Sequence, residues 1–433
     1  MSQVKSVDPV RGAARHRLAN PYTAIREISE EATRSCAAFT GLATPAPYRI
    51  PTKEWKSIDA RNAALRAWHA SSLRLLEASI RGDSHPALAV SLLDHLPPHV
   101  GWNHHRNLQL AKINTPVFFR TDQTADGVIF EVQCPGSLWG VHELLREFYE
   151  TWGDDGARST PSLAAEFAGA LQRRLGCRPV IHHLLDNSSH PAGERFFIQR
   201  ARRHASYFGY DEVRPNDCNF VRGHDFFALL VENFAARRLQ RLTDGTLLYD
   251  LPPVVLFDQK LLLTLPFDPE TRGEYSDAVR RLFPYTALLR PSGIVLEDGN
   301  RVTIEQFAAL PRAQRAFFLK YAGSDVSRNW GSQSVFHLAK LGRAACESAL
   351  RDAAARFEAG ERWLLQRACE SRETVSYITR AGAVETTSAH SKHSVFYGPD
   401  GALASLIMFE DFYKVHGSNE TVTTIGVARD DRD

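Results

Sequence analysis

Apolar side chains recur at helical spacing near the start of the chain. Leu65, Trp68, Leu75 and Leu76 lie three or four residues apart within residues 60–82, with Ser72 between them. This spacing places them on one face of an α-helix. A second apolar stripe, over 86–96, ends at a Pro-Pro pair that breaks helices. We therefore predict a helical N-terminal region over residues 1–112.

The pattern changes near residue 115, where apolar and polar positions begin to alternate. Residues 116–122 and 128–133 read as two strands joined by an Ala-Asp-Gly turn. Alternation over 128–133 puts Ile129, Glu131 and Gln133 on one face of the second strand. A helix over 141–152 is expected to follow.

Along the rest of the chain, segments with helical spacing of apolar residues alternate with segments that read as strands. This pattern predicts an α/β (α+β) fold. A strand over 178–186 precedes a helix over 195–210, and 252–265 repeats that strand-then-helix pattern. Further strands are expected at 315–323, 362–370, 393–410 and 420–428, with a long helix over 334–361. We divide the chain into regions 1–112, 113–255 and 256–433, the second of which carries the strand pair.

Composition and charge exclude several classes of protein. The 433 residues contain 52 Lys and Arg against 50 Asp and Glu, a net charge of +2. This balance gives no electrostatic case for binding nucleic acid. No apolar run reaches the roughly 18–20 residues that span a bilayer, and the start of the chain has no secretory pattern. The six scattered cysteines form no CxxC pair. We expect a cytoplasmic protein with no membrane partner.

Four polar residues gather at the paired strands: Arg120, Asp122, Glu131 and Gln133. Opposite side chains of paired strands lie about 5 Å apart, so Asp122 and Glu131 can converge. Two carboxylates and an amide oxygen suit Mg²⁺, and an arginine suits a phosphate or carboxylate. The alternative is an exposed hairpin with alternating polar residues.

A lysine and a small-residue loop form the second candidate. Lys320 ends an apolar strand, and the loop after it contains Gly323, Ser324, Gly331 and Ser332. Main-chain N–H groups of such loops can hold nucleotide phosphates, although the Walker A pattern is absent. The alternative is a solvated lysine beside an ordinary surface loop.

Two further segments are less specific. Gln366 ends the strand over 363–366, a position from which main-chain groups can meet an adenine edge; the alternative is a plain strand. Lys414 lies in a polar loop between two apolar strands, where it can pair with an acyl phosphate or a carboxylate. The alternative is a hairpin turn with an incidental basic residue.

Taken in chain order, these segments resemble the ATP-grasp superfamily in its circularly permuted form, in particular the amide-ligase domain of glutathionylspermidine synthetase. The order is Arg-x-Asp and Glu-x-Gln at 120–133, then Phe-Leu-Lys at 318–320, then Trp-Leu-Leu-Gln at 363–366. The resemblance implies a two-lobed nucleotide-binding architecture, with the ATP-grasp lobes in 256–433.

The resemblance also implies roles for the residues. It makes Asp122, Glu131 and Gln133 the magnesium ligands, Arg120 a catalytic contact to phosphate or intermediate, and Ser137 a substrate contact. It makes Lys320 an ATP-phosphate lysine, 323–332 a mobile lid, and Gln366 the adenine hinge. A second ATP lysine is left open between Lys260 and the region of Lys392 and Lys414. Gln133 replaces the usual asparagine, and the hinge lacks the common Gln-Glu pair.

The implied activity is an ATP-dependent carboxylate–amine ligase, which forms an amide through an acyl phosphate and releases ADP and phosphate. Its cofactors would be ATP and Mg²⁺, and its partners a small-molecule carboxylate and an amine. The oligomeric state is left open, with a homodimer as the commonest soluble assembly. A non-catalytic ATP-binding or regulatory protein on a degenerate scaffold is the first alternative. A kinase-like transfer to another acceptor is the second.

Overall fold

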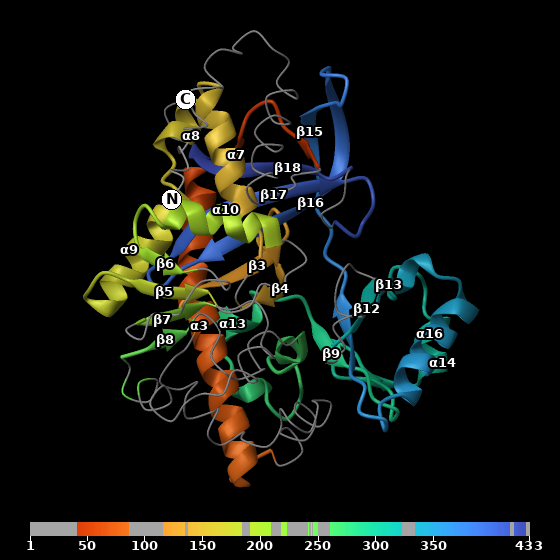
Figure 1. Cartoon of the computed structure of the whole chain (residues 1–433). Coiled ribbons are helices and arrows are strands. Elements are labelled where there is room, and N and C mark those ends of the chain that lie inside the picture. The colour runs from red at the N-terminus through yellow and green to blue at the C-terminus, as the bar shows by residue number, and fades with distance from the viewer. Residues whose placement is uncertain are drawn as a thin grey trace.

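The computed structural model describes residues 41–85, 116–134, 137–183, 191–208, 218–222, 241, 244, 246–249, 260–322, 334–415 and 420–429. The described helices and strands form an α+β fold with one eight-stranded sheet, two four-stranded sheets and a two-stranded hairpin (Figure 1). Within these residues, no helix is both long and apolar enough to cross a membrane.

An eight-stranded sheet forms the centre of the molecule. Its order is β15-β1-β18-β17-β16-β3-β4, and β2 also pairs with β18. The strands are β1 (Leu42–Ala43), β2 (Tyr48–Pro51), β3 (Phe119–Gln123), β4 (Ile129–Gln133), β15 (Arg372–Ile378), β16 (Val384–Tyr397), β17 (Ala402–Glu410) and β18 (Val422–Arg429). The strands predicted around 116–133, 393–410 and 420–428 are thereby confirmed.

Helices cover both faces of this sheet, as the alternation of its strands requires. Val395 and Ile407 point toward α3 (Thr52–Arg81), in a core that includes Trp68. Their neighbours Phe396 and Leu406 point the opposite way, into a second core with α7 (Trp139–Thr151) and α9 (Leu163–Leu175). The helices predicted at 60–82 and 141–152 are confirmed as α3 and α7.

The predicted helical N-terminal region also contains strands. β1 and β2 precede α3 and pair in parallel with β18, at the other end of the sequence. Alternation is not visible in strands this short, so only their long-range pairing reveals them. The predicted stripe over 86–96 lies outside the described residues.

A second sheet is parallel and lies beyond α7 and α9. Its order is β6-β5-β7-β8, formed by β5 (Val180–His183), β6 (Ser206–Phe208), β7 (Phe220–Arg222) and β8 (Leu248–Tyr249). The helix predicted over 195–210 is wrong at its end. α10 (Pro191–Ala201) stops early, because Ser206–Phe208 pairs with β5 instead.

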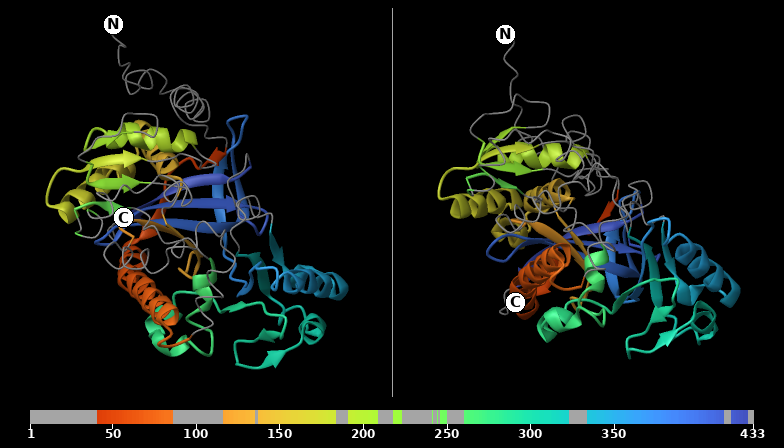
Figure 2. Two further views of the ribbon diagram at one scale, coloured as in Figure 1. Left: turned by 60° about the horizontal axis from the view of Figure 1, so that its bottom comes forward. Right: turned by 90° about the horizontal axis from the view of Figure 1, so that it is seen from below.

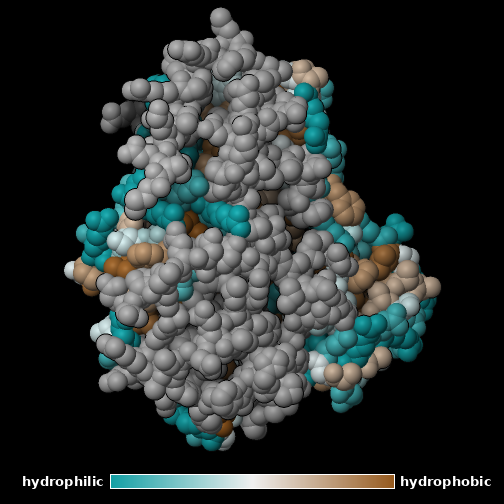
Figure 3. All heavy atoms as spheres, viewed as in Figure 1, coloured by the Kyte–Doolittle hydropathy of each residue, from teal (hydrophilic) through white to brown (hydrophobic). Residues whose placement is uncertain are grey.

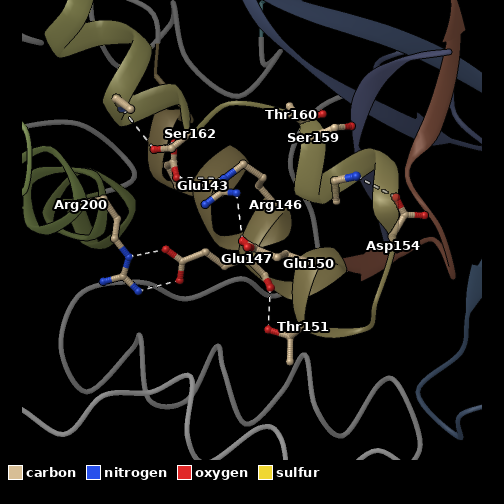
Figure 4. A network of polar contacts seen from close by, with 12 residues as sticks. Glu143, Arg146, Glu147, Glu150, Thr151, Asp154, Ser159, Thr160, Ser162 and Arg200 are labelled. Carbon is tan, nitrogen blue, oxygen red and sulfur yellow. Dashed lines mark hydrogen bonds and ion pairs between the residues drawn. The ribbon is translucent and has the colours of Figure 1, made fainter. Parts of the chain in front are cut away.

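Ion pairs hold the helices of this region together (Figure 4). Arg200 of α10 forms a two-pronged ion pair with Glu147 of α7. Glu143, also of α7, is fully buried and accepts hydrogen bonds from the Ser162 hydroxyl and from the main-chain N–H of Ala164, at the start of α9. Asp154 is the N-cap of the short helix α8 (Asp155–Ser159), and its side chain accepts from the Ala157 N–H. These contacts fix α7, whose first residue follows the loop at Ser137.

The third sheet lies to one side of the rest in every view (Figures 1 and 2). Its order is β13-β12-β14-β9, from β9 (Thr286–Leu288), β12 (Phe317–Tyr321), β13 (Val335–His337) and β14 (Trp363–Arg367). Helices α14 (Ile304–Ala309) and α16 (Arg343–Ala355) pack on one face. The strands predicted at 315–323 and 362–370 are thereby confirmed. A hairpin of β10 (Ile294–Val295) and β11 (Arg301–Val302) extends this unit, whose surface in Figure 3 mixes hydrophilic and hydrophobic side chains.

The helix predicted over 334–361 begins nine residues later than expected. Val335–His337 pairs with β12, and the 3-10 helix Leu338–Lys340 follows it. Gly342 is the N-cap of α16. Val335 and Leu338 have the three-residue spacing of a helical stripe, but pairing with β12 makes Val335 part of a strand.

Three short helices link the parallel sheet to the third one. They are the 3-10 helices Lys260–Thr264 and Arg272–Glu274, and α13 (Asp277–Arg280). Residues 252–259 of the predicted strand-then-helix lie outside the described residues. The division at residues 112 and 255 stays a prediction.

Candidate functional site

The strand pair β3–β4 brings the first predicted set together. Asp122 lies opposite Glu131, and Arg120 lies opposite Gln133. The pairing is irregular next to Asp122, because Phe130 of β4 has no partner there. Because of this bulge, Ile129 does not share a face with Glu131 and Gln133, and that part of the prediction was wrong. Ile129 now joins Val132 in the core, whereas Phe130 approaches Lys320 of the third sheet.

The carboxylate of Asp122 is fully engaged by protein groups. Its Oδ1 accepts from Arg120 Nε at 3.0 Å and from the Ser394 hydroxyl at 2.8 Å. Its Oδ2 accepts from Arg120 Nη2 at 3.2 Å and lies 3.3 Å from Lys392 Nζ. Burial alone would raise the pKa of Asp122, but Arg120 and Lys392 outweigh burial and lower that pKa to about 2. Asp122 is therefore a charged, buried anchor.

Arg120 links Asp122 to the loop before α7. Its Nη1 donates to the Ser137 hydroxyl at 2.9 Å and to the Ser137 carbonyl at 3.0 Å. The side chain is only 3% exposed. All three guanidinium nitrogens are thus committed to Asp122 and Ser137. Arg120 positions that loop, and a phosphate contact would require it to change partners.

Glu131 is more open than Asp122. Its Oε1 lies 3.4 Å from Lys260 Nζ, and its side chain is 26% exposed. Burial would raise the pKa of Glu131, and Lys260 reverses that effect and keeps the pKa below its ordinary value. Of the lysines left open as the second ATP lysine, Lys260 is thus in the site. Gln133, two residues along the same strand, is half-buried.

Lys320 faces this cluster from the third sheet. Its Nζ donates to Gln366 Oε1 at 2.6 Å and lies 5.4 Å from the centre of the Phe130 ring. Burial lowers the pKa of Lys320, and Glu131 opposes that shift. The side chain of Gln366 is fully buried and lies beneath Lys320. An adenine contact, as predicted for Gln366, would therefore involve the main chain at this position.

β16 contributes a third strand to the site. Ser394 lies opposite Asp122, and Lys392 is two residues away on the same face. Lys392 was one of several lysines left open by the sequence, and Ser394 was missed. Residues 390–394 are all polar, so no alternation in the sequence separates the face of Lys392 and Ser394 from the other face of β16. Asp122, which accepts from Ser394, is 272 residues away in sequence, so only the fold brings the two residues together.

The site has an excess of positive charge. Arg120, Lys260, Lys320 and Lys392 surround two carboxylates, Asp122 and Glu131. The sum of four cations and two anions is +2. Low-dielectric surroundings strengthen such a field. The described side chains therefore suit a polyanionic ligand such as a nucleotide triphosphate.

Lys414 lies near the same edge of the third sheet, but next to aromatic side chains. Its Nζ is 6.0 Å from the centre of the Tyr413 ring. Tyr413 in turn stacks on Phe318 of β12, at 5.9 Å, and contacts His337 of β13. The pairing of Lys414 with an acyl phosphate or a carboxylate stays a prediction. Sequence reasoning missed the aromatic group around Tyr413.

The predicted lid follows Lys320 in the chain. Gly323, Ser324, Gly331 and Ser332 lie outside the described residues. Lys320 and Ala322 precede that segment, and Ser334 follows it, with its carbonyl accepting from the Tyr321 N–H at 3.0 Å. The two ends of the segment are thus close together beside Lys320.

Magnesium fits only part of the predicted ligand set. Glu131 and Gln133 present oxygens on one side of β4, which suits a cation that also keeps waters and phosphates. Asp122 does not fit as arranged, because both of its oxygens already accept from Arg120, Lys392 and Ser394. Among the described residues, no group of three or more His, Cys, Asp or Glu side chains is arranged to hold a metal ion.

Comparisons with known proteins inform the fold. No protein-family model matches the sequence. No curated protein matches it either. The solved structure of a glutathione synthetase-like effector from Globodera pallida is similar, with a TM-score of 0.50, 12% identity and 98% of each chain covered. A putative gamma-glutamylcysteine synthetase from Methylobacillus flagellatus gives a TM-score of 0.37 at 11% identity, over 76% of this chain and 82% of that one. The chain thus shares an overall fold with the first of these proteins.

Proposed function

We propose that this protein is an ATP-dependent ligase that joins a carboxylate to an amine. The observation that carries the proposal is the convergence of Lys260, Lys320 and Lys392 on the two carboxylates of the β3–β4 pair. Lys260 comes from a 3-10 helix, Lys320 from the third sheet and Lys392 from the eight-stranded sheet. A fold similar to that of a glutathione synthetase-like protein also supports a ligase.

The proposed reaction has two steps. The substrate carboxylate attacks the terminal phosphorus of ATP, which forms an acyl phosphate and releases ADP. The amine then attacks the acyl carbon, loses a proton and displaces phosphate. In such chemistry, a protein contributes mainly alignment and neutralisation of charge.

The residues of the site divide these tasks. The three lysines would neutralise the phosphate oxygens, and Arg120 would keep the Ser137 loop beside the substrate carboxylate. Glu131 and Gln133 would hold Mg²⁺, which supplies charge neutralisation at the phosphates when bound. Segment 323–332 would exclude water from the acyl phosphate, and Lys414 would contact that intermediate.

The test is ADP release by the purified protein in mixtures of carboxylates and amines. We expect release to require both, and hydroxylamine to trap the acyl phosphate as a hydroxamate. Glu131→Gln should abolish release, whereas Glu385→Gln, on the exposed part of β16, should not change it. ADP release that survives Glu131→Gln would contradict the assignment of Glu131.

A second candidate is a non-catalytic nucleotide-binding protein. The saturated carboxylate of Asp122 favours it, because one predicted metal ligand is already occupied by protein groups. Stabilisation by ATP in a thermal-shift titration, without ADP release under any substrate mixture, would identify this candidate.

A further inference from the structure

A buried threonine–glutamine pair lies beneath the lysine of the third sheet. We propose that Thr286 and Gln366 are positioning residues, which hold the Lys320 ammonium by a neutral hydrogen-bond relay and leave its charge for an anionic ligand. The proposal rests on the proposed function, since the ligand would be the phosphates of ATP. It gives Gln366 a different role from the adenine contact expected from sequence.

The register of three strands creates the relay. Thr286 of β9 lies opposite Gln366 of β14, and Gln366 lies opposite Phe318 of β12. Lys320 follows Phe318 by two residues and so projects from the same face. Thr286 and Gln366 are both fully buried. The strand pairing alone thus brings the three polar side chains of the relay into one layer.

The direction of each hydrogen bond is determined by chemistry. The Thr286 hydroxyl donates its single proton to the Pro284 carbonyl at 2.9 Å. It can therefore only accept from Gln366, whose Nε2 lies 3.3 Å away. That contact turns Gln366 Oε1 toward Lys320, at 2.6 Å. The Lys320 ammonium group can only donate, so it requires the oxygen of the Gln366 amide on its side. The contact with Thr286 requires the same amide orientation.

A neutral partner distinguishes Lys320 from the other lysines of the site. Lys260 pairs with Glu131, and Lys392 pairs with Asp122. A carboxylate in place of Gln366 would neutralise Lys320, whereas an amide dipole stabilises the ammonium and leaves its charge uncancelled. Without an anchor, a lysine side chain has several rotamers to lose on binding a ligand. The relay would hold the Lys320 side chain in one rotamer before the ligand binds, so less conformational entropy would be lost on binding.

The experiment compares the affinities of the variants for ATP and for adenosine, which lacks phosphates. Gln366→Met should weaken ATP binding by about 10–100-fold, because it removes a hydrogen bond to a charged group, and Thr286→Val by about 5-fold. Adenosine binding should change by less than about 2-fold in both. Thr286→Ser keeps the acceptor and should restore ATP binding. Thr271→Val removes another buried hydroxyl that donates to a carbonyl, and serves as the control.

Two results would overturn the inference. The first is an equal loss of ATP and adenosine binding in Thr286→Val, which would indicate structural damage. The second is full additivity of Thr286→Val and Gln366→Met, because residues of one relay must be coupled. If the wild type binds no ATP, the proposed function fails by itself. Crystal structures then test the relay: Lys320 Nζ should leave the Gln366 amide in Thr286→Val, and an unmoved Nζ refutes it.

Discussion

At the scale of single residues, Asp122 and Glu131 look alike in sequence but differ in surroundings. Asp122 is 2% exposed and balances two cations, whereas the Glu131 side chain is 26% exposed and pairs with one lysine. Removing one member of a buried ion pair leaves an uncompensated charge, which costs several kcal/mol. The two carboxylates should therefore respond differently to loss of charge.

We predict that Asp122→Asn lowers the free energy of unfolding by about 3 kcal/mol at pH 7, measured by urea denaturation. Glu131→Gln should change it by less than about 1 kcal/mol, and the exposed Asp277→Asn should leave it unchanged. The folded-state pKa of Asp122 is below its ordinary value of 3.8, at about 2. Its stabilisation is thus complete above pH 4 and disappears as pH falls toward 2. A gap between wild type and Asp122→Asn that persists at pH 2 would contradict this.

His142 of α7 gives a second prediction for a single residue. It is fully buried, and within the described part of the chain neither ring nitrogen has a hydrogen-bond partner. Burial, assisted by the charge of Arg146, lowers its pKa from 6.5 to about 3. Its neutral form favours the folded state above pH 6.5, and that stability is lost as pH falls toward 3, by up to about 1.4 kcal/mol per pH unit.

His142→Leu should therefore unfold at higher urea than the wild type at pH 5, with a smaller difference at pH 7.5. The exposed His204→Leu is the control for the loss of a histidine side chain from the surface. Parallel stability curves for wild type and His142→Leu between pH 7.5 and 5 would show that His142 is not held neutral in the folded state.

At the scale of elements, β16 shows one strand with two environments. Val395 is fully buried near the site, whereas Val384, at the other end, is 58% exposed. We predict that Val395→Ala costs about 2 kcal/mol of stability, from two lost methyl groups and a small cavity. Val384→Ala should cost less than about 0.5 kcal/mol. Equal costs in urea denaturation would mean that the site end of β16 is not tightly packed.

The elements also show which parts of the site were predictable. The alternation around Glu131 and the turn at Asp126-Gly127 are local signals, and they predicted the β3–β4 pair with Asp122 opposite Glu131. The bulge at Phe130, the strand at Val335–His337 and the neighbours of Lys392 depend on partners far away in sequence. Local patterns do not contain those partners, so the relay beneath Lys320 could not be predicted.

At the scale of the whole molecule, the beginning and the end of the described chain build one sheet. β1 and β2 add to β18, and Ile50, Ile58 and Trp68 fill the same core as Val395 and Ile407. The third sheet differs, because the buried core under α14 and α16 draws all of its residues from 285–365. We therefore expect the third sheet to fold more independently of the rest of the chain than β1, β2 and α3 do.

This difference gives a prediction about fragments. A fragment of residues 113–433 should aggregate or lack a cooperative thermal transition, because it loses β1, β2 and α3 and exposes the edge of β18. A fragment of residues 282–370 should unfold cooperatively in circular dichroism, since it keeps its core and its four strands. Adding a separate 1–112 fragment to 113–433 should restore folded protein if the loss is due to the missing strands. A monomeric 113–433 fragment with the thermal stability of the full chain would instead support the division at 112.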